Sequence, residues 1–296
     1  MVDPATCGVC GGALALRFPG TLGGNNVTAA AFSPTCHEPG AHLDLYACER
    51  CGTVQQPALP AGGALLDLYR DMTDDAYLDE EAGRRATARR LLDGVERHVT
   101  RGRLLDVGCG HGLLLDEARR RGWSVTGIEP AAAAREHAAG ALGLDVRDVT
   151  LDALAAEPFD AIVMADVIEH LEDPAGAVRD CARLVTPGGV VCVVTPDPSS
   201  RTARLAGRRW WGYLPAHTYL LPRRTLRGLL ERAGFAPVAD GGLRRSFTLG
   251  YWMAGLGERS GAVGAIAERI RRAPFARRRL TLSLGDERVI VARRRA

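Results

Sequence analysis

The sequence predicts an α/β fold: a mainly parallel sheet with helices on both faces, preceded by a small cysteine-rich module. Short apolar segments alternate with amphipathic segments from about residue 101 onward. A glycine-rich turn, Asp106-Val-Gly-Cys-Gly-His-Gly112, joins one such apolar segment to a helical one. Two Cys-x-x-Cys pairs stand in the first 60 residues, which are rich in Gly and Pro and lack helical periodicity. Repeated strand–helix units with nearly continuous apolar strands are typical of a parallel sheet covered on both faces.

The cysteine pairs predict a structural zinc site in residues 1–60. The four thiols are Cys7, Cys10, Cys48 and Cys51. Two such pairs complete a tetrahedral four-thiolate site for Zn²⁺, which has no open coordination position and therefore no expected catalytic role. Cys36, His37 and His42 are alternative ligands, although their simpler interpretation is as loop residues.

Helical spacing and turn residues define the remaining elements. Residues 61–100 are expected to form a helical cap or linker, with helices between Leu65 and His98. From residue 101 the expected strands are 103–107, 124–128, 144–147, 159–164, 189–195, 235–239 and 288–292. The expected helices are 113–121, 131–142, 174–184, 225–233 and 249–272. Residues of about 200–285 are expected to contain insertions that bind the acceptor.

The glycine turn predicts a ligand site at the carboxyl ends of the strands. Glycines at 108 and 110 let the backbone approach a ligand closely, and dinucleotide-binding folds share this feature. Asp106 before the turn suits a cationic ligand such as S-adenosylmethionine and fits a pyrophosphate poorly. Glu129, after the next strand, is placed to accept hydrogen bonds from ribose hydroxyls. Asp148 and Asp166 follow the third and fourth strands and should face the same crevice, with Asp148 at the adenine edge.

These motifs together resemble class I S-adenosylmethionine-dependent methyltransferases. The resemblance rests on Asp-Val-Gly-Cys-Gly, Glu129-Pro130, Asp166-Val-Ile-Glu-His-Leu-x-Asp-Pro174 and Leu184-Val-Thr-Pro-Gly-Gly189. It implies a Rossmann-like seven-stranded sheet with a terminal antiparallel strand. It also implies that Gly108 and Gly110 line the methionine part of the cofactor. Glu129 with Pro130 would bind the ribose, and Asp148 with Val149 the adenine.

An aromatic segment, Trp210 to Leu220, predicts the acceptor side of the site. It follows the fifth main strand in a chain otherwise poor in aromatic residues. His217 is the expected base, because a neutral imidazole can take a proton from a hydroxyl or an activated carbon. His170 and Tyr213 are further catalytic candidates. For each histidine the alternative is a packing residue hydrogen-bonded inside the fold.

The zinc module and the Pro-x-His-x-Tyr-Leu segment are similar to bacterial sugar and natural-product methyltransferases. In sugar C-methyltransferases the segment is of the His-Glu-His-x-x-Tyr-Phe type. His217 matches the second His, whereas Pro215 and Ala216 replace the first two residues. The expected acceptor is therefore a small molecule, a sugar, nucleotide-sugar or natural-product intermediate, with O- and C-methylation both open.

Charge and composition bound the partners and leave rival functions open. All 38 basic residues are Arg, and residues 1–200 carry a net charge of −12 against +15 for residues 201–296. The basic third fits phosphates or a solvated surface, so an rRNA or tRNA base methyltransferase is the main alternative. The clustered aromatics and the lack of an Asn-Pro-Pro-Tyr-type pocket argue against nucleic acid. A non-enzymatic zinc module on a degenerate fold is the third hypothesis. We expect a cytoplasmic monomer or homodimer without a transmembrane segment or secretion signal.

Overall fold

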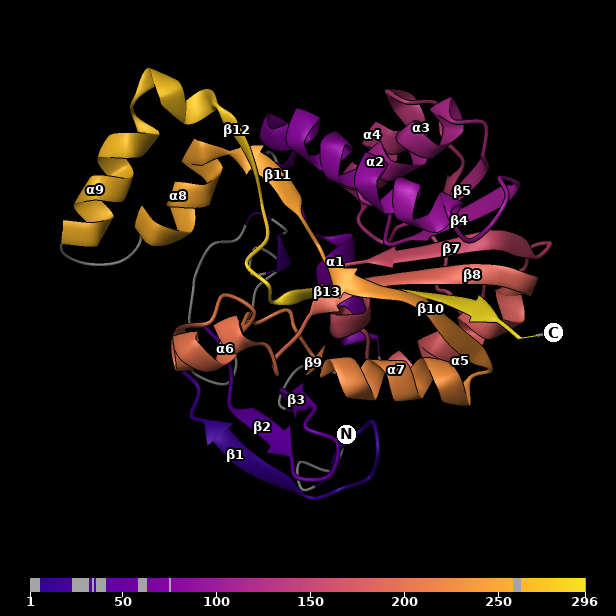
Figure 1. The fold of residues 1–296 in the computed structure, drawn as a ribbon, viewed down its shortest axis with the longest axis horizontal. Coiled ribbons are helices and arrows are strands. Elements are labelled where there is room, and N and C mark those ends of the chain that lie inside the picture. Colours follow the sequence, from indigo (N-terminus) through magenta and orange to yellow (C-terminus); the bar gives the residue numbers. More distant parts are fainter. Residues whose placement is uncertain are drawn as a thin grey trace.

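The computed structural model describes residues 6–22, 32–33, 35, 41–57, 63–74, 76–257 and 262–295. Its centre is a seven-stranded sheet in the order β10-β13-β8-β7-β4-β5-β6 (Figure 1). The strands are β4 (Arg103–Val107), β5 (Ser124–Ile128), β6 (Val146–Arg147), β7 (Phe159–Ala165), β8 (Val185–Pro196), β10 (Phe235–Gly242) and β13 (Glu287–Arg294). β13 is antiparallel to both β8 and β10, and the β8-to-β6 pairs are parallel. The predicted α/β sheet with a terminal antiparallel strand is confirmed.

Helices cover both faces of the sheet because successive strand residues point to opposite sides. In β4, Leu104 packs with α2 (Glu81–Glu96), α3 (Leu113–Arg120) and α4 (Ala132–Gly140) in one hydrophobic cluster. The next residue, Leu105, packs with α5 (Pro174–Leu184) and α7 (Arg223–Arg232) in another. Figure 1 shows these two layers above and below the strands. The functional loops therefore start from strands that are fixed on both faces.

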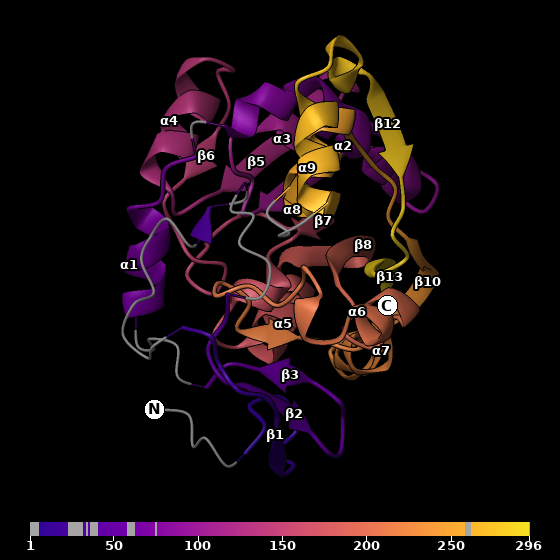
Figure 2. The ribbon, with the colours of Figure 1, turned by 90° about the vertical axis from the view of Figure 1, so that its left-hand side faces the viewer.

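The cysteine-rich module folds as a small antiparallel sheet that the core chain completes. Its strands are β1 (Leu14–Phe18), β2 (Leu45–Cys48) and β3 (Val54–Gln55), and the fourth is β9 (Tyr219–Leu220). Val54 pairs with Leu220, and Gln55 pairs with Tyr219. Figures 1 and 2 both place this sheet beneath α5 and α7. The aromatic segment is thus tied to the N-terminal module.

The two long helical regions are each divided in the structure. Residues 65–98 form α1 (Ala64–Arg70), the short 3-10 helix η2 (Tyr77–Glu80) and α2. Residues 249–272 contain α8 (Leu249–Gly257) and α9 (Ala262–Arg271). The strands β11 (Arg245–Thr248) and β12 (Arg279–Leu282), which the sequence did not predict, pair in an antiparallel hairpin whose connection contains these two helices. β11 passes so close to α2 that a Cβ on Gly83 would lie 2.1 Å from the Ser246 carbonyl oxygen.

Asp286 anchors the aromatic segment from the turn before β13. Its Oδ2 accepts hydrogen bonds from Trp210 Nε1 at 2.7 Å and Trp211 Nε1 at 2.6 Å, and the residue is buried. Asp286→Ala leaves two indole N–H groups without this acceptor, so we expect the free energy of unfolding to fall by about 2–4 kcal/mol. Urea unfolding measures this loss. Asp286→Asn, which keeps an acceptor oxygen, should lose clearly less, and equal losses in the two variants would contradict the hydrogen-bond explanation.

Candidate active site

The glycine turn between β4 and α3 requires glycine for its backbone shape and its close packing. Gly108, Gly110 and Gly112 have φ angles of 66°, 53° and 78°, which side chains rarely tolerate. A Cβ on Gly108 would lie 2.6 Å from Val167 Cγ2. The Gly108 amide donates to the Ile128 carbonyl at 2.8 Å, which fastens the turn to the end of β5. The turn therefore presents bare backbone at the carboxyl edge of the sheet.

Two buried carboxylates flank this turn. Glu129 accepts hydrogen bonds from the Gly110 amide at 2.7 Å and the Ala131 amide at 2.9 Å. Asp106 is 3% exposed, and burial, followed by the charge of Glu129, raises its pKa well above the ordinary value. Within the described ranges no basic side chain forms an ion pair with Asp106. A cationic ligand would relieve this concentration of buried negative charge.

The other predicted cofactor residues surround the same edge. Asp148 forms ion pairs with Arg135 at 3.3 Å and Arg70 at 3.9 Å, and its side chain is 42% exposed. Val149 packs against the hydrophobic cluster on the α5 face, and the Pro130 carbonyl accepts a hydrogen bond from Arg135 at 2.7 Å. Burial raises the pKa of Glu129, and the negative charge of Asp148 adds a smaller effect in the same direction. Asp148 and Glu129 therefore share one electrostatic environment.

Asp166 stands at the end of β7 in a strained conformation. Its φ of 57° is the only positive value at a non-glycine position among the described residues. Its carboxylate accepts two hydrogen bonds from Arg245 Nη2, at 2.7 and 2.6 Å, and Arg245 also pairs with Glu287. Strain of this kind persists where the surrounding structure fixes the residue, often at functional sites. The β11 hairpin thereby reaches the ligand edge of the sheet through Arg245.

The two histidines predicted on the acceptor side lie together. The rings of His170 and His217 are 4.9 Å apart at an interplanar angle of 69°. Tyr69 of α1 joins them, with its hydroxyl oxygen 2.6 Å from His170 Nδ1. Burial, and then the proximity of His217, lowers the pKa of His170 to about 3, and burial lowers the pKa of His217. Both imidazoles are therefore neutral near pH 7.

The hydrogen bonds of these histidines define which ring nitrogen is free. His217 Nδ1 lies 2.7 Å from the Gly212 carbonyl oxygen, and His170 Nδ1 lies 3.0 Å from the Ala216 carbonyl oxygen. A carbonyl oxygen can only accept, so Nδ1 of His217 carries the proton and its Nε2 is left with an unshared electron pair. Nδ1 of His170, from η3 (Ile168–His170), has two neighbours, the Ala216 carbonyl and the Tyr69 hydroxyl, and a hydroxyl can donate or accept. Nε2 of His170 has no hydrogen-bond partner among the described residues.

Tyr213, although only four residues from His217, faces the N-terminal module. Its ring packs against Trp210 with a centroid distance of 5.0 Å and against Phe18 at 5.7 Å. It belongs to the hydrophobic cluster that Leu45 and Val54 form with the aromatic segment. These contacts are those of a packing residue between module and core, separate from the histidine pair.

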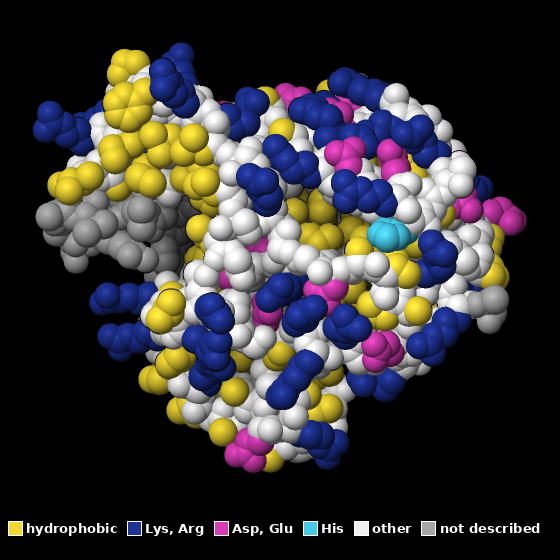
Figure 3. All heavy atoms as spheres, in the orientation of Figure 1, with side chains coloured by type: hydrophobic (Ala, Val, Ile, Leu, Met, Phe, Trp, Pro, Cys, Tyr) yellow, Lys and Arg dark blue, Asp and Glu magenta, His cyan; other side chains and the backbone are white. Residues whose placement is uncertain are grey.

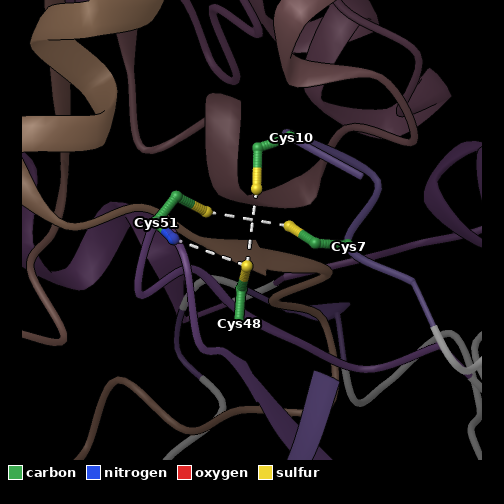
Figure 4. Close-up of side chains that lie close together, drawn as sticks. All are labelled: Cys7, Cys10, Cys48 and Cys51. Carbon is green, nitrogen blue, oxygen red and sulfur yellow. Dashed lines mark hydrogen bonds between the residues drawn. The ribbon is translucent and has the colours of Figure 1, made fainter. Parts of the chain in front are cut away.

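The four predicted zinc ligands converge in the module. Figure 4 shows their side chains pointing toward a common centre. The Sγ atoms of Cys7 and Cys51 are 3.8 Å apart, those of Cys10 and Cys48 are 3.4 Å apart, and all four lie within 4.8 Å of one another. Sulfurs bound tetrahedrally to one zinc ion are separated by about 3.8 Å. The donor set and spacing fit Zn²⁺.

Among the other possible ligands of the module, His42 does not join this cluster. His42 is buried, and its Nδ1 lies 2.7 Å from the Leu43 carbonyl oxygen. It is absent from the group of four cysteines that could hold a metal ion. Cys36 and His37 lie outside the described residues.

The module also holds the aromatic segment, Trp210 to Leu220, in place. Gln56, just after β3, donates from Nε2 to the carbonyl oxygens of Leu214 at 2.8 Å and His217 at 2.7 Å. Thr225 Oγ1 donates to the Cys51 carbonyl at 2.7 Å. The second cysteine pair is therefore linked through a few hydrogen bonds to the backbone of His217.

Three residues near the site escaped the sequence analysis. Tyr77 stacks on His111 of the glycine turn with a centroid distance of 4.5 Å, and Tyr69 bonds His170. Both come from the cap, where the sequence pattern indicates only that Tyr69 occupies an apolar position of a helix. Arg245 comes from the unpredicted hairpin, and nothing distinguishes it from the many other arginines of the C-terminal third. The two tyrosines could have been predicted only from the packing of the cap against the glycine turn, which the sequence does not show.

The fold and the glycine-turn site define an S-adenosylmethionine-dependent methyltransferase. Residues 79–240, more than half of the chain, match the methyltransferase-domain family, and the chain belongs to that family.

Named relatives and solved structures agree with this assignment. The chain is 33% identical over 184 residues to a ubiquinone biosynthesis O-methyltransferase of Cereibacter sphaeroides, covering 57% of this chain and 74% of that protein. It is 42% identical over 113 residues to one of Paracidovorax citrulli, covering 35% of this chain and 48% of that protein. The match thus spans from about half to three quarters of these relatives.

Solved structures share the fold at low identity. An Archaeoglobus fulgidus S-adenosylmethionine-dependent methyltransferase aligns with a TM-score of 0.51 and 20% identity, covering 75% of this chain and all (100%) of that one. The N-methyltransferase NodS of Bradyrhizobium japonicum, in complex with S-adenosyl-L-homocysteine, aligns with a TM-score of 0.50 and 16% identity, covering 77% and 96%. None of the described helices is both long and apolar enough to span a bilayer.

Proposed function

We propose that this enzyme transfers a methyl group from S-adenosylmethionine to a hydroxyl group of a small molecule in the cytoplasm. The observation that carries the proposal is the unprotonated Nε2 of His217, whose ring lies 4.9 Å from that of His170. His170 belongs to η3, which follows β7, and Val167, three residues before His170, packs on the glycine turn. The naming of the relatives as ubiquinone biosynthesis O-methyltransferases supports oxygen as the acceptor atom.

The cofactor residues are proposed to divide the ligand among them. The cofactor supplies a methyl group activated by a sulfonium. Gly108 and Gly110 give the methionine part access to the backbone, and buried Asp106 faces its ammonium group. Glu129 and Pro130 border the ribose, and Asp148 with Val149 borders the adenine. Asp166, held by Arg245, closes the edge between the cofactor and the histidine pair.

The acceptor side then needs to align a hydroxyl and remove its proton. Methyl transfer is an in-line displacement, so orientation and water exclusion contribute most of the rate. His217 takes the hydroxyl proton at Nε2, while the Gly212 carbonyl fixes its tautomer through Nδ1. Tyr69 and the Ala216 carbonyl orient His170 beside it. Burial of His217 keeps water away from the base.

The four-cysteine cluster is proposed to bind one structural zinc ion. The sulfur spacing supports this, and four thiolates leave no position for a substrate. Its contribution to the reaction is then indirect, through β3, Gln56 and the backbone of the acceptor segment.

His217→Ala is expected to lower kcat about 100-fold while leaving S-adenosylmethionine binding nearly unchanged, because the variant loses the base and keeps the glycine turn. Turnover is measured with phenols and sugar hydroxyls, and cofactor binding by calorimetry. His98→Ala, a histidine at the end of α2, serves as the control and should keep full activity. Unchanged turnover in His217→Ala would remove this residue from the mechanism.

The same assay separates the rival acceptor classes. On the face drawn in Figure 3, arginines are spread among acidic and apolar side chains instead of forming one basic stripe. Several C-terminal arginines are also paired, Arg223 and Arg227 with Asp240 and Arg288 with Asp197. Methyl transfer to small hydroxyl compounds with no labelling of tRNA or rRNA is the expected result. Labelled RNA bases, or a new C–CH₃ bond in the product, would refute O-methylation of a small molecule.

A further inference from the structure

A second group of potential metal ligands lies on the acceptor side of the site. A carboxylate oxygen of Glu169 and one ring nitrogen each of His170 and His217 lie within 4.8 Å of one another. Glu169 and His217 are buried, whereas His170 is partly exposed, so the group is accessible from one side. The three residues come from η3 and from the segment before β9, which Thr218 Oγ1 joins by donating to the His170 carbonyl at 3.3 Å.

The hydrogen bonds around this group leave one atom of each residue without a partner among the described residues. Glu169 Oε2 accepts from Thr195 Oγ1 at 2.9 Å, but Oε1 has no hydrogen-bond partner within the described part of the chain. A buried oxygen without a partner is rare in folded proteins and calls for an explanation. Both histidines are bonded through Nδ1, His217 to the Gly212 carbonyl and His170 to the Ala216 carbonyl and the Tyr69 hydroxyl, and neither Nε2 has a partner among the described residues. Metal-binding histidines commonly have their second nitrogen bonded in this way, which fixes the tautomer and the ring orientation.

We propose that Glu169, His170 and His217 bind a divalent transition-metal ion of the Zn²⁺ class, with an open position for the acceptor oxygen. Two histidines and one glutamate are a ligand set of catalytic zinc sites, in which the fourth position holds water or substrate. Imidazole ligands favour such ions over Mg²⁺. Ligand atoms about 2.1 Å from one ion lie about 3.4 Å apart, so small side-chain rotations complete the site.

The catalytic consequence of this site rests on the proposed O-methyl transfer. With the ion bound, Nε2 of His217 is a ligand and no longer the base, and the acceptor proton goes to solvent, because an oxygen that coordinates a divalent cation loses its proton readily. The acceptor oxygen then forms the C–O bond to the methyl carbon. The S–C bond breaks at the same time, and its electron pair goes to sulfur, which becomes a neutral thioether. Methyl transfer would therefore depend on a second metal ion beside the one held by the four cysteines.

Metal stoichiometry of the full-length protein tests the binding without turnover. Protein treated with a mild chelator, so that it keeps one zinc per chain, is titrated with Zn²⁺ by calorimetry and metal analysis, with Mg²⁺ as a second titrant. We expect one further Zn²⁺ per chain and far weaker Mg²⁺ binding. Glu169→Gln, which keeps the shape, and His217→Ala should each weaken the second site at least about 100-fold, the most that loss of an outer-shell partner costs. His98→Ala should bind like the wild type.

Two results would overturn the inference. The first is a total of one zinc per chain at saturating Zn²⁺, and the second is equal binding of the further ion by wild type, Glu169→Gln and His217→Ala. Activity gives a separate answer: turnover should fall at least about 100-fold when the further ion is removed and return when Zn²⁺ is added. Turnover that persists without the ion would refute its catalytic role. If no hydroxyl compound is methylated but the further zinc binds, only the proposed function fails.

Discussion

Cys48→Ser is expected to abolish zinc binding at the proposed four-cysteine site and to lower kcat about 100-fold, although Cys48 lies outside the proposed reaction site. Structural zinc contributes folding free energy outright, about 10 kcal/mol or more in small zinc modules. Cys48 ends β2, and its Sγ lies 3.4 Å from that of Cys10. Loss of one of four thiolates therefore releases the sheet to which β9 belongs.

The effect reaches the reaction through the backbone of His217. β3 pairs with β9, and Gln56 donates to the His217 carbonyl at 2.7 Å. A displacement of about 1 Å of a reacting group can cost about 100-fold in rate. The glycine turn lies on β4 and contacts none of these strands in the sheet order, so S-adenosylmethionine should still bind.

Three measurements check this prediction together: zinc per chain, kcat and calorimetric binding of S-adenosylmethionine. The control is Cys181→Ala, which removes a buried thiol of α5 that is no part of the four-cysteine cluster. That variant should keep its zinc and its acceptor-side activity. Zinc-depleted Cys48→Ser protein with wild-type kcat would show that the module does not position the acceptor segment.

The sequence was sufficient for the parts of the fold that have a local signal. β4, β7 and β8 contain apolar runs, and the glycine turn, α5 and the cysteine pairs each have their own pattern. Glu129 was predicted to face the ligand crevice because it ends the next strand, and its hydrogen bond to Gly110 puts it beside the glycine turn. Single strands and the alternation of their side chains can be predicted in this way because both are set within a few residues.

The parts that the sequence did not predict depend on contacts between distant residues. β3 and β9 are two-residue strands, too short for a period, and they pair across more than half of the chain. Tyr213 and His217 were both catalytic candidates, yet they face opposite directions, toward the module and toward His170. The segment between them is irregular, so no periodicity assigns its faces. Asp286, which holds Trp210, follows that segment by about a quarter of the chain.

The cysteine-rich module packs against the aromatic segment and, through Gln56, bonds the backbone that carries His217. The module buries Tyr213 and Trp210 on one side of the aromatic segment, and this leaves His217 on the other side. Gln56 holds the backbone of His217 through a hydrogen bond to its carbonyl, while Tyr69 of the cap contacts the imidazole of His170. Two regions outside the aromatic segment, the module and the cap, therefore set the distance between the two imidazoles, and neither carries a recognisable acceptor motif.

Glu129→Ala is expected to weaken S-adenosylmethionine binding by at least about 100-fold. The Glu129 carboxylate accepts hydrogen bonds from the Gly110 amide at 2.7 Å and the Ala131 amide at 2.9 Å, so it holds the glycine turn against the end of β5. Hydrogen bonds to a charged group contribute about 1.5–3 kcal/mol each. Losing both frees the turn, and the proposed ribose contacts are lost as well.

Calorimetry with S-adenosylmethionine measures the effect, and Glu136→Ala, an exposed acid on α4, is the matched control with unchanged affinity. Glu129→Gln should recover little, because its NH₂ group faces a backbone N–H that needs an acceptor. Removing this charge also removes one cause of the raised pKa of Asp106, so the pKa of Asp106 should move down toward its ordinary value. Affinity within two-fold of wild type in Glu129→Ala would mean that the glycine turn binds the cofactor without this carboxylate.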